Sequence, residues 1–254
     1  TRGKQKMTST NPLSVFASHS LRRALPTICR EFEKRSGVEV KILFGHSGAL
    51  RTEIEGNLAC DIFCSADTAN PKALVTAMKA SRVFPYASNS LIIVTRNERR
   101  FQNSTWLDVL CDPSIAIGTS TPKVSSEGDW TRSLFQNVAR DYPGEIGAGI
   151  IGQHSVALVG GNRTGEDLDQ ETEAGFILKH GVDAAVVYAS ERRAVEKEGL
   201  KVYAIPEKTA PRIVYGACHP RSGKSPAKLC REFEEFLISA CARAELAKDG
   251  FLPP

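Results

Sequence analysis

Residues 13–65 read LSVFASHSLRRALPTICREFEKRSGVEVKILFGHSGALRTEIEGNLACDIFCS. Three β-prone runs, at 13–17, 38–44 and 61–65, alternate with two segments whose apolar residues recur at helical spacing. This series predicts parallel strands in one sheet, with the connecting helices packed on its faces. Pro26 lies inside the first helical segment, which should open at Ser20, and we expect it to distort the early turns of that helix.

The same alternation resumes farther along the chain. Residues 89–95 form an almost continuous apolar run, which is typical of a strand buried on both faces. Further helices and strands follow, and residues 211–218 are again β-like. Ser225 and Pro226 then mark the start of a final helix. The sequence therefore predicts an α/β fold of two lobes, each a mainly parallel sheet flanked by helices.

The predicted division into lobes is discontinuous. Lobe one would contain residues 13–92 and 212–254, and lobe two would contain residues 93–211. Two strands, near 91–95 and 212–217, would cross between the lobes and act as the hinge.

Composition excludes several classes of protein. The chain has 254 residues, of which 41% are hydrophobic and 24% charged, as in ordinary globular proteins. The formal net charge of +4 comes from scattered basic residues, which argues against binding to nucleic acid. No apolar run approaches the roughly 20 residues that cross a bilayer. Residues 1–12 are polar and basic, so we expect a disordered leader or a processed end, with no signal peptide visible.

The seven cysteines show neither a CxxC pair nor a zinc-like spacing with histidine. Several of them fall at apolar positions of predicted helices or strands, where cysteine acts as a small hydrophobic residue. We therefore expect mostly free, buried thiols, although the sequence alone leaves their redox state and the compartment open.

Two turns share one design, in which a buried strand is followed by a short polar turn and a helix. The first contains His19 and Ser20, and the second contains His46 and Ser47. In a parallel sheet both turns lie at the carboxyl ends of strands, where the N-termini of helices converge. Unpaired N–H groups and serine hydroxyls at such a place form a neutral cradle for an anion. The alternative is that Ser20 and Ser47 are ordinary N-caps.

Several segments together resemble the periplasmic molybdate-binding proteins of ABC transporters, which have the type II periplasmic binding fold. The resemblance covers about residues 13–245 and is strongest over the first third. It is carried by VFASHSL at 15–21, FEKRSGV at 32–38, FGHSGAL at 44–50, CDIFCSAD at 60–67, NSLIIV at 89–94, GTSTP at 118–122 with EGDW at 127–130, and VYAS at 187–190.

This resemblance implies a solute-binding protein that captures molybdate or tungstate between two lobes and catalyses nothing. Ser20 and Ser47 match the two ligand serines, and the turn at Glu127 and Gly128 matches a backbone donor of lobe two. Tyr188 matches a tyrosine whose hydroxyl reaches the anion, although it could equally be a tyrosine packed at the end of a strand. The implied protein is a periplasmic or secreted monomer without a cofactor, and its partner is an ABC transporter.

The chain departs from this family at His19 and His46, where small residues are usual. Neutral histidines could donate to the anion, and protonated ones would make its binding depend on pH. Alternatively, both histidines could bind a divalent cation together with Asp67, Glu127 or Asp129, or both could simply face the solvent.

The enzymatic alternative is a serine hydrolase. The sequence GHSGA at 45–49 lies between a predicted strand and a predicted helix, as a nucleophile elbow with Ser47 would. However, Ala49 replaces the second glycine of that motif, and His219 lacks a convincing acidic partner. We therefore expect no enzymatic activity.

Overall fold

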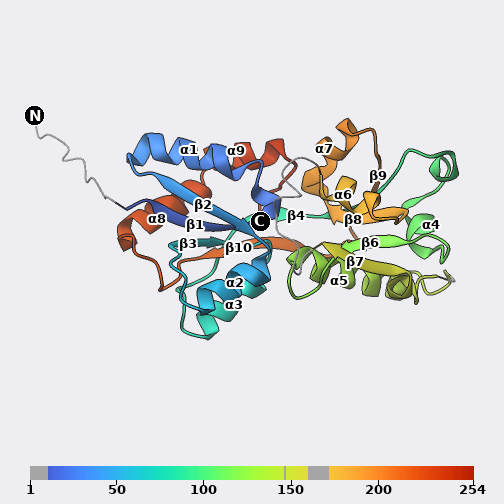
Figure 1. Cartoon of the computed structure of the whole chain (residues 1–254), viewed down its shortest axis with the longest axis horizontal. Helices are drawn as coiled ribbons and strands as arrows, with labels where there is room; N and C mark the ends of the chain where they lie inside the picture. Colours follow the sequence, from blue (N-terminus) through green and yellow to red (C-terminus); the bar gives the residue numbers. More distant parts are fainter. Residues whose placement is uncertain (1–10, 146, 160–171) are drawn as a thin grey trace, which may run out of the picture. The chain divides into compact units, whose positions relative to one another are not determined.

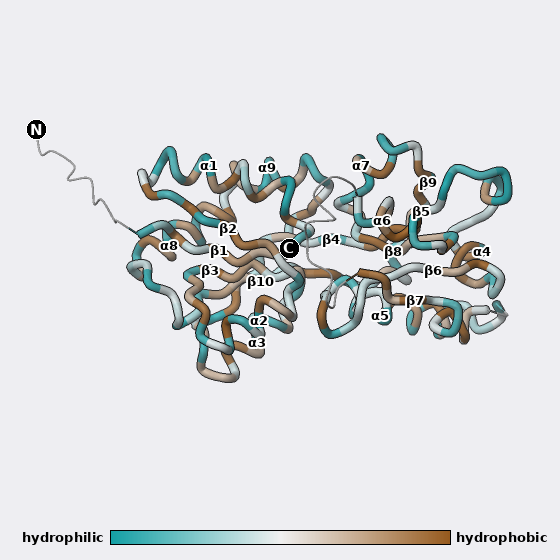
Figure 2. The backbone as a smooth tube through the Cα atoms, in the orientation of Figure 1, coloured by the Kyte–Doolittle hydropathy of each residue, from teal (hydrophilic) through white to brown (hydrophobic). Residues whose placement is uncertain are grey.

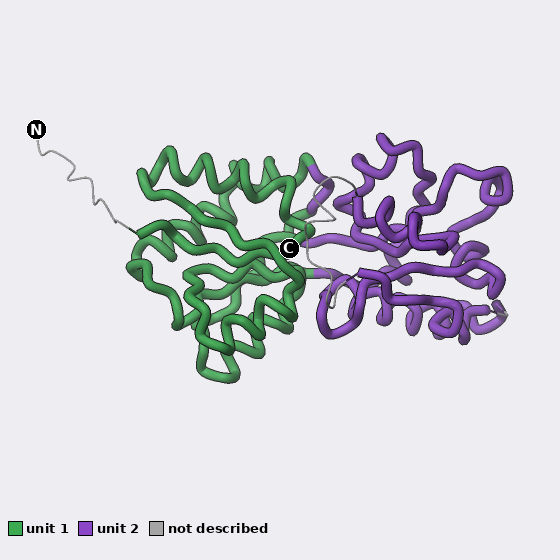
Figure 3. The backbone as a smooth tube through the Cα atoms, viewed as in Figure 1, with its two compact units in different colours: residues 1–87, 214–248, 252–254 green, residues 88–213, 249–251 purple. Residues whose placement is uncertain are grey.

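The computed structural model describes residues 11–145, 147–159 and 172–254, so residues 1–10 of the predicted leader lie outside the described part. The chain forms two compact units, coloured separately in Figure 3. Unit 1 contains the described part of residues 1–87 with residues 214–248 and 252–254, and unit 2 contains the described part of residues 88–213 with residues 249–251.

The chain passes between the units at strands that differ in part from the predicted ones. One passage lies within β4 (Phe84–Asn89), a strand that the sequence analysis missed. Another lies at the start of β10 (Ile213–Cys218), close to the predicted crossing strand at 212–217, and residues 249–251 add a short excursion into unit 2. The predicted crossing strand at 91–95 is β5 (Leu91–Thr95), which follows this first passage directly and belongs to unit 2.

Unit 1 is built on a five-stranded sheet of order β2-β1-β3-β10-β4. Strand β1 pairs in parallel with β2 and β3, whereas β10 is antiparallel to β3. Helices α1, α8 and α9 pack together, and α2 and α3 form a second group (Figure 1). The bounds are β1 Leu13–Ser18, α1 Leu25–Ser36, β2 Val40–Gly45, α2 Ser47–Glu55, β3 Ile62–Cys64, α3 Ala69–Thr76, α8 Ala227–Leu237 and α9 Ala240–Lys248.

The first helix begins later than predicted. Residues His19–Leu21 form one turn of 3-10 helix (η1), and the α-helix starts only at Leu25. Pro26 consequently lies in the first turn of α1, where the missing N–H would have no partner inside the helix anyway. The predicted distortion of an early turn therefore does not arise, because α1 begins only one residue before Pro26.

The buried strands of unit 1 carry much of its hydrophobic surface, as the colouring of β1 and β3 in Figure 2 shows.

A buried carboxylate fastens the start of β1 to the segment that leads into α8. Asp61 accepts hydrogen bonds from the backbone N–H groups of Ser14, Lys224 and Ser225, and also from the Ser225 hydroxyl. Because Asp61 is only 3% exposed, these four donors substitute for water around its charge.

Unit 2 is built on a five-stranded sheet of order β7-β6-β8-β5-β9. Strand β6 pairs in parallel with β7 and β8, whereas β5 is antiparallel to β8 and β9. Both sheets are thus mixed, and the predicted α/β class is confirmed. The remaining bounds are η2 Arg99–Phe101, α4 Trp106–Cys111, β6 Ile117–Ser120, α5 Ser126–Asp141, η3 Ile151–Gln153, β7 Ser155–Val159, α6 Glu173–Lys179, β8 Ala184–Tyr188, η5 Ala189–Glu191, α7 Arg192–Lys197 and β9 Lys201–Ala204.

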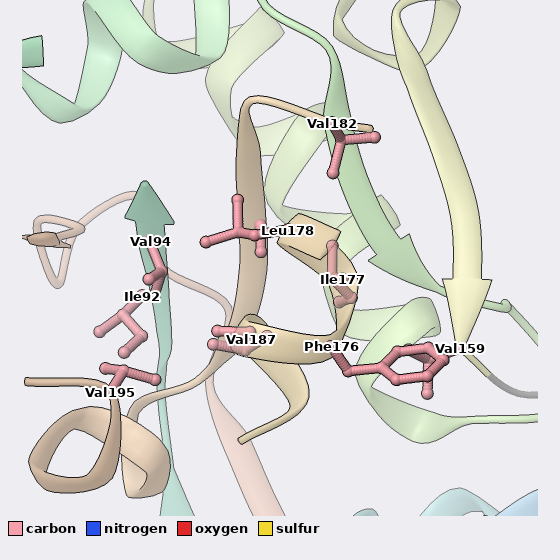
Figure 4. Packing of buried hydrophobic residues seen from close by; sticks show 11 residues of the cluster. Ile92, Val94, Val159, Phe176, Ile177, Leu178, Val182, Val187 and Val195 are labelled. Atoms are coloured by element: carbon pink, nitrogen blue, oxygen red, sulfur yellow. The ribbon is translucent and has the colours of Figure 1, made fainter. Parts of the chain in front are cut away.

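The core of unit 2 on the side of α6 and α7 is almost entirely aliphatic (Figure 4). Ile177 of α6 and Val182 pack closely over β6, where Gly118 leaves them room. A Cβ atom at Gly118 would lie 2.1 Å from Cγ2 of Ile177, so the close approach of α6 to the sheet depends on this glycine.

All seven cysteines are free, and six of them are buried, which confirms the expectation from sequence. Burial raises the pKa of the Cys29 and Cys218 thiols to about 12, so these groups remain protonated and behave as core residues. Within the described residues, no helix is both long enough and apolar enough to span a membrane.

Candidate functional site

The two predicted turns of unit 1 are neighbours in space. Ser18, the last residue of β1, pairs in register with Gly45, the last residue of β2, so the turns that follow leave the same edge of the sheet. The rings of His19 and His46 meet edge to face, with their centroids 5.3 Å apart. The structure therefore brings together the predicted residues of unit 1.

Ser20 is held by two other hydroxyl groups. The hydroxyl of Tyr215, a fully buried residue of β10, donates a hydrogen bond of 3.0 Å to Ser20 Oγ. Ser18 Oγ lies 3.1 Å from Ser20 Oγ, and either hydroxyl can be the donor of that bond. Because Tyr215 supplies one hydrogen to Ser20, and Ser18 can supply another, the hydrogen of Ser20 itself can point to a further acceptor.

Ser47 is oriented in a comparable way. It is the first residue of α2 and is 1% exposed. Its Oγ accepts a hydrogen bond of 3.1 Å from the backbone N–H of Ala66, which follows β3. The hydroxyl hydrogen of Ser47 is then directed away from Ala66, so Ser47 is prepared to act as a donor.

Neither serine is an N-cap, so the N-cap interpretation is wrong. The N-cap of α2 is His46, which makes no side-chain capping bond, and Ser20 lies within the 3-10 turn η1. At the start of α2, the first backbone N–H groups have no carbonyl partner within the helix. Together with the dipole of α2, these groups make the end of β2 favourable for a negative charge.

The predicted residues of unit 2 also lie close together. Glu127 and Gly128 are in the first turn of α5, and Tyr188 is the last residue of β8 and is buried. The backbone N–H of Tyr188 donates to Oε1 of Glu127. A Cβ atom on Gly128 would lie 2.5 Å from the carbonyl oxygen of Ser120, so glycine allows α5 to begin directly against the end of β6.

The Glu127 carboxyl turns into unit 2, where it meets two more buried glutamates. Ser120 Oγ lies 2.9 Å from Oε2 of Glu127 and within hydrogen-bonding distance of Oε1 of Glu173. Oε2 of Glu191 accepts the backbone N–H of Glu173 at 2.9 Å. Burial, followed by the charges of Glu173 and Glu191, raises the pKa of Glu127 well above its ordinary value.

The alternative cation site lacks a complete set of ligands. Within the residues that the structure describes, no three His, Cys, Asp or Glu side chains are grouped in a way that could hold a metal ion. Both carboxylate oxygens of Asp67 accept hydrogen bonds from Asn70, and Asp129 accepts the backbone N–H of Lys123. The pairing of His19 with His46 is therefore not extended into a metal centre.

Residues 13–252 match the family described as "Bacterial extracellular solute-binding protein". The chain belongs to this family. An uncharacterized protein of Pasteurella multocida is 26% identical over 250 residues, which cover 95% of this chain and 98% of that protein. The molybdate-binding protein ModA of Mycobacterium tuberculosis is also 26% identical over 250 residues, covering 94% of this chain and 84% of ModA. The predicted resemblance to the molybdate-binding proteins is thereby confirmed.

Solved structures confirm the predicted type II periplasmic binding fold of this solute-binding protein. The periplasmic molybdate-binding protein of Azotobacter vinelandii superposes with a TM-score of 0.69 at 19% identity, covering 95% of this chain and 99% of that one. The sulfate-binding protein SubI of M. tuberculosis superposes with a TM-score of 0.76 at 16% identity, covering 96% and 87%. Because the family consists of solute-binding proteins, the chain is not an enzyme and the hydrolase alternative based on Ser47 is wrong.

Sequence reasoning missed the residues that orient the predicted ones. Tyr215 lies in an apolar strand and looks like a core residue, and Ser120 and Glu173 are far apart in the chain. The available signals were weak: a tyrosine inside a buried strand needs a partner for its hydroxyl, and a glutamate in the first turn of a helix is often held by local contacts.

Proposed function

We propose that this solute-binding protein captures a tetrahedral metal oxyanion, molybdate or tungstate, for uptake through an ABC transporter. The observation that carries the proposal is the orientation of Ser20 and Ser47. Each serine oxygen accepts a hydrogen bond from the fold, from Tyr215 and Ala66 respectively, so each hydroxyl can present its hydrogen to an anion. The start of α2 adds N–H groups to these donors.

Neutral donors suit a doubly negative guest that has no proton of its own. Monohydrogen phosphate would bring a proton that needs an acceptor, whereas Ser20 Oγ and Ser47 Oγ already accept hydrogen bonds from the fold. Sulfate has the same charge as molybdate and a smaller radius, so it is the competitor that the size of the site must exclude. The predicted contributions of unit 2 are the backbone at Glu127 and Gly128 and the side chain of Tyr188.

The similarity to ModA supports the choice of oxyanion and the partnership with a transporter. We accordingly propose a periplasmic location and a monomeric state, with no cofactor besides the captured anion. His19 and His46 lie beside the serines and would border the anion rather than hold a cation.

The test is titration calorimetry of the full chain with molybdate, tungstate, sulfate and phosphate, accompanied by thermal melting. An anion present at 100 times its dissociation constant should add about 2.7 kcal/mol of stability. We expect molybdate and tungstate to bind, and we expect Ser20→Ala and Ser47→Ala to weaken them at least about tenfold, equivalent to about 1.4 kcal/mol for a lost charged hydrogen bond. The exposed Ser81→Ala is the matched control. Tight binding of sulfate alone would show that sulfate, and not molybdate or tungstate, is the ligand. Binding of none of the four anions would refute the proposal.

A further inference from the structure

Three glutamates and one serine meet inside unit 2, at the start of α5, the start of α6 and the end of β6. Glu127 is 2% exposed, Glu173 is 7% exposed and Glu191 is 5% exposed, while Ser120 is fully buried. Carboxylates this deeply buried normally have cations or many donors around them. Here the hydroxyl of Ser120 contacts both Glu127 and Glu173.

The number of hydrogens in this cluster decides the protonation state. Ser120 Oγ carries a single hydrogen, yet it contacts Oε2 of Glu127 at 2.9 Å and also Oε1 of Glu173. If both carboxyls were ionised, one of these two contacts would bring two oxygen lone pairs together with no hydrogen between them. One of the two carboxyl groups must therefore supply a hydrogen of its own.

Glu127 is placed to supply it. Its Oε1 accepts the N–H of Tyr188, which leaves Oε2, the oxygen facing Ser120, as the place for a proton. We infer that Glu127 is protonated on Oε2 and donates to Ser120 Oγ, that Ser120 donates to Glu173, and that this proton positions Tyr188 and the start of α5 for ligand binding. The linkage to ligand rests on the proposed function, whereas the proton itself does not.

The surrounding charges agree with this assignment. Among the residues that the structure describes, the charges of Glu173 on α6 and Glu191 on η5 raise the pKa of Glu127, and the hydrogen bond with Ser120 opposes them in part. Oε2 of Glu191 accepts hydrogen bonds from the N–H groups of Glu173 and Ala174, which holds this carboxyl at the start of α6.

Loss of the proton would weaken the site. With Glu127 and Glu173 both ionised, Ser120 could donate its hydrogen to only one of them. The two carboxylates would then repel each other, and this force would act on Glu127, which holds the backbone N–H of Tyr188. We therefore expect oxyanion affinity to fall as the pH rises through the pKa of Glu127. Because one proton is involved, the limiting slope is about tenfold per pH unit.

Two variants isolate this proton. In Glu127→Gln the amide can accept from Tyr188 through its oxygen and donate to Ser120 through its nitrogen, so it mimics the protonated carboxyl permanently. In Glu173→Gln the neighbouring charge is removed, and Glu127 can ionise and accept from Ser120. The exposed Glu207→Gln is the control, since its side chain lies outside the cluster.

The first measurement uses the ligand-free full chain. Infrared difference spectra at about pH 7 should show the carbonyl stretch of a protonated carboxyl in the wild type and in Glu207→Gln, and this band should be absent in Glu127→Gln. In Glu173→Gln the band should disappear at lower pH than in the wild type. Absence of the band from the wild type would overturn the assignment of the proton, whatever the chain binds.

The second measurement follows molybdate affinity between about pH 6 and pH 9. We expect affinity to decline with pH in the wild type and in Glu207→Gln, and to show no such decline in Glu127→Gln. Parallel declines in the wild type and Glu127→Gln would overturn the positioning role. If molybdate fails to bind any variant, the proposed ligand is wrong, and the infrared band together with the pH dependence of melting still decides the question of the proton.

Discussion

Replacement of Tyr215 by phenylalanine tests whether the fold orients a serine for ligand binding. The hydroxyl of Tyr215 donates a hydrogen bond of 3.0 Å to Ser20 Oγ, and the ring itself is completely buried. Tyr215→Phe removes only that hydroxyl. The Ser20 hydroxyl can then rotate and donate its hydrogen bond to Ser18 Oγ, which lies 3.1 Å away. One intramolecular hydrogen bond is worth about 1 kcal/mol, so we expect oxyanion affinity to fall about fivefold.

Tyr86 supplies an unusually close control. It is 1% exposed, its ring meets that of Tyr215 edge to face at a centroid separation of 6.0 Å, and its hydroxyl donates 3.0 Å to the backbone carbonyl of Ser65. Tyr86→Phe should lower the free energy of unfolding by about the same 1 kcal/mol as Tyr215→Phe. Its effect on oxyanion affinity should be smaller than that of Tyr215→Phe, because Tyr86 donates to the carbonyl of the peptide unit between residues 65 and 66 and reaches Ser47 only through the N–H of that unit.

The assay is titration calorimetry of both variants and the wild type with molybdate, with denaturant unfolding measured alongside. A third variant, Tyr215→Phe combined with Ser20→Ala, completes a double-mutant cycle, in which the effect of Tyr215→Phe on affinity should vanish once Ser20 is absent. Equal losses of affinity in Tyr86→Phe and Tyr215→Phe would refute the reasoning, since the effect would then reflect general loosening of the core. An unchanged affinity in Tyr215→Phe would refute it as well.

Three further predictions concern the scaffold. Asp61→Ala should lower the free energy of unfolding by about 3 kcal/mol, measured by urea denaturation, because it leaves three partly buried backbone N–H groups without their carboxylate. Gly118→Ala should cost about 1–3 kcal/mol in the same assay, because its Cβ would overlap Ile177. In the folded chain a thiol reagent should modify Cys241 alone, as mass spectrometry would show, because the other six thiols are buried and the pKa of Cys218, for example, is raised to about 12. Modification of a second cysteine without unfolding would contradict the packing described for the core.

The early part of the fold could be predicted because its signals are local. In residues 13–65 apolar runs of strand length alternate with helical periodicity, and the parallel strands β1, β2 and β3 follow directly from that order. Strand β4 was missed because Pro85 and Asn89 interrupt its pattern. The topology explains why the proline is tolerated: β4 is at the edge of its sheet, where a missing N–H need not break a ladder.

The site could be predicted only in part, for a similar reason. Ser20 and Ser47 each follow a strand within a short segment, so their place at the end of the sheet is visible from sequence. Their orientation is not visible, because it comes from Tyr215 on a strand nearly two hundred residues away in the chain and from the backbone of Ala66. Contacts of that kind depend on which strands become neighbours, which local periodicity does not encode.

The two units handle negative charge in opposite ways. In unit 1, hydroxyl groups are turned by the fold so that their hydrogens can meet an anion, and this needs no titration. In unit 2, Glu127 stands next to the backbone of Gly128 and Tyr188, which are predicted to serve the same anion. With Glu127 and Glu173 both ionised, two like charges would face each other in the buried interior of unit 2, where water screens their repulsion poorly. The proton inferred on Glu127 removes this repulsion and supplies the second hydrogen that the two contacts of Ser120 require, so one proton accounts for the geometry of the cluster.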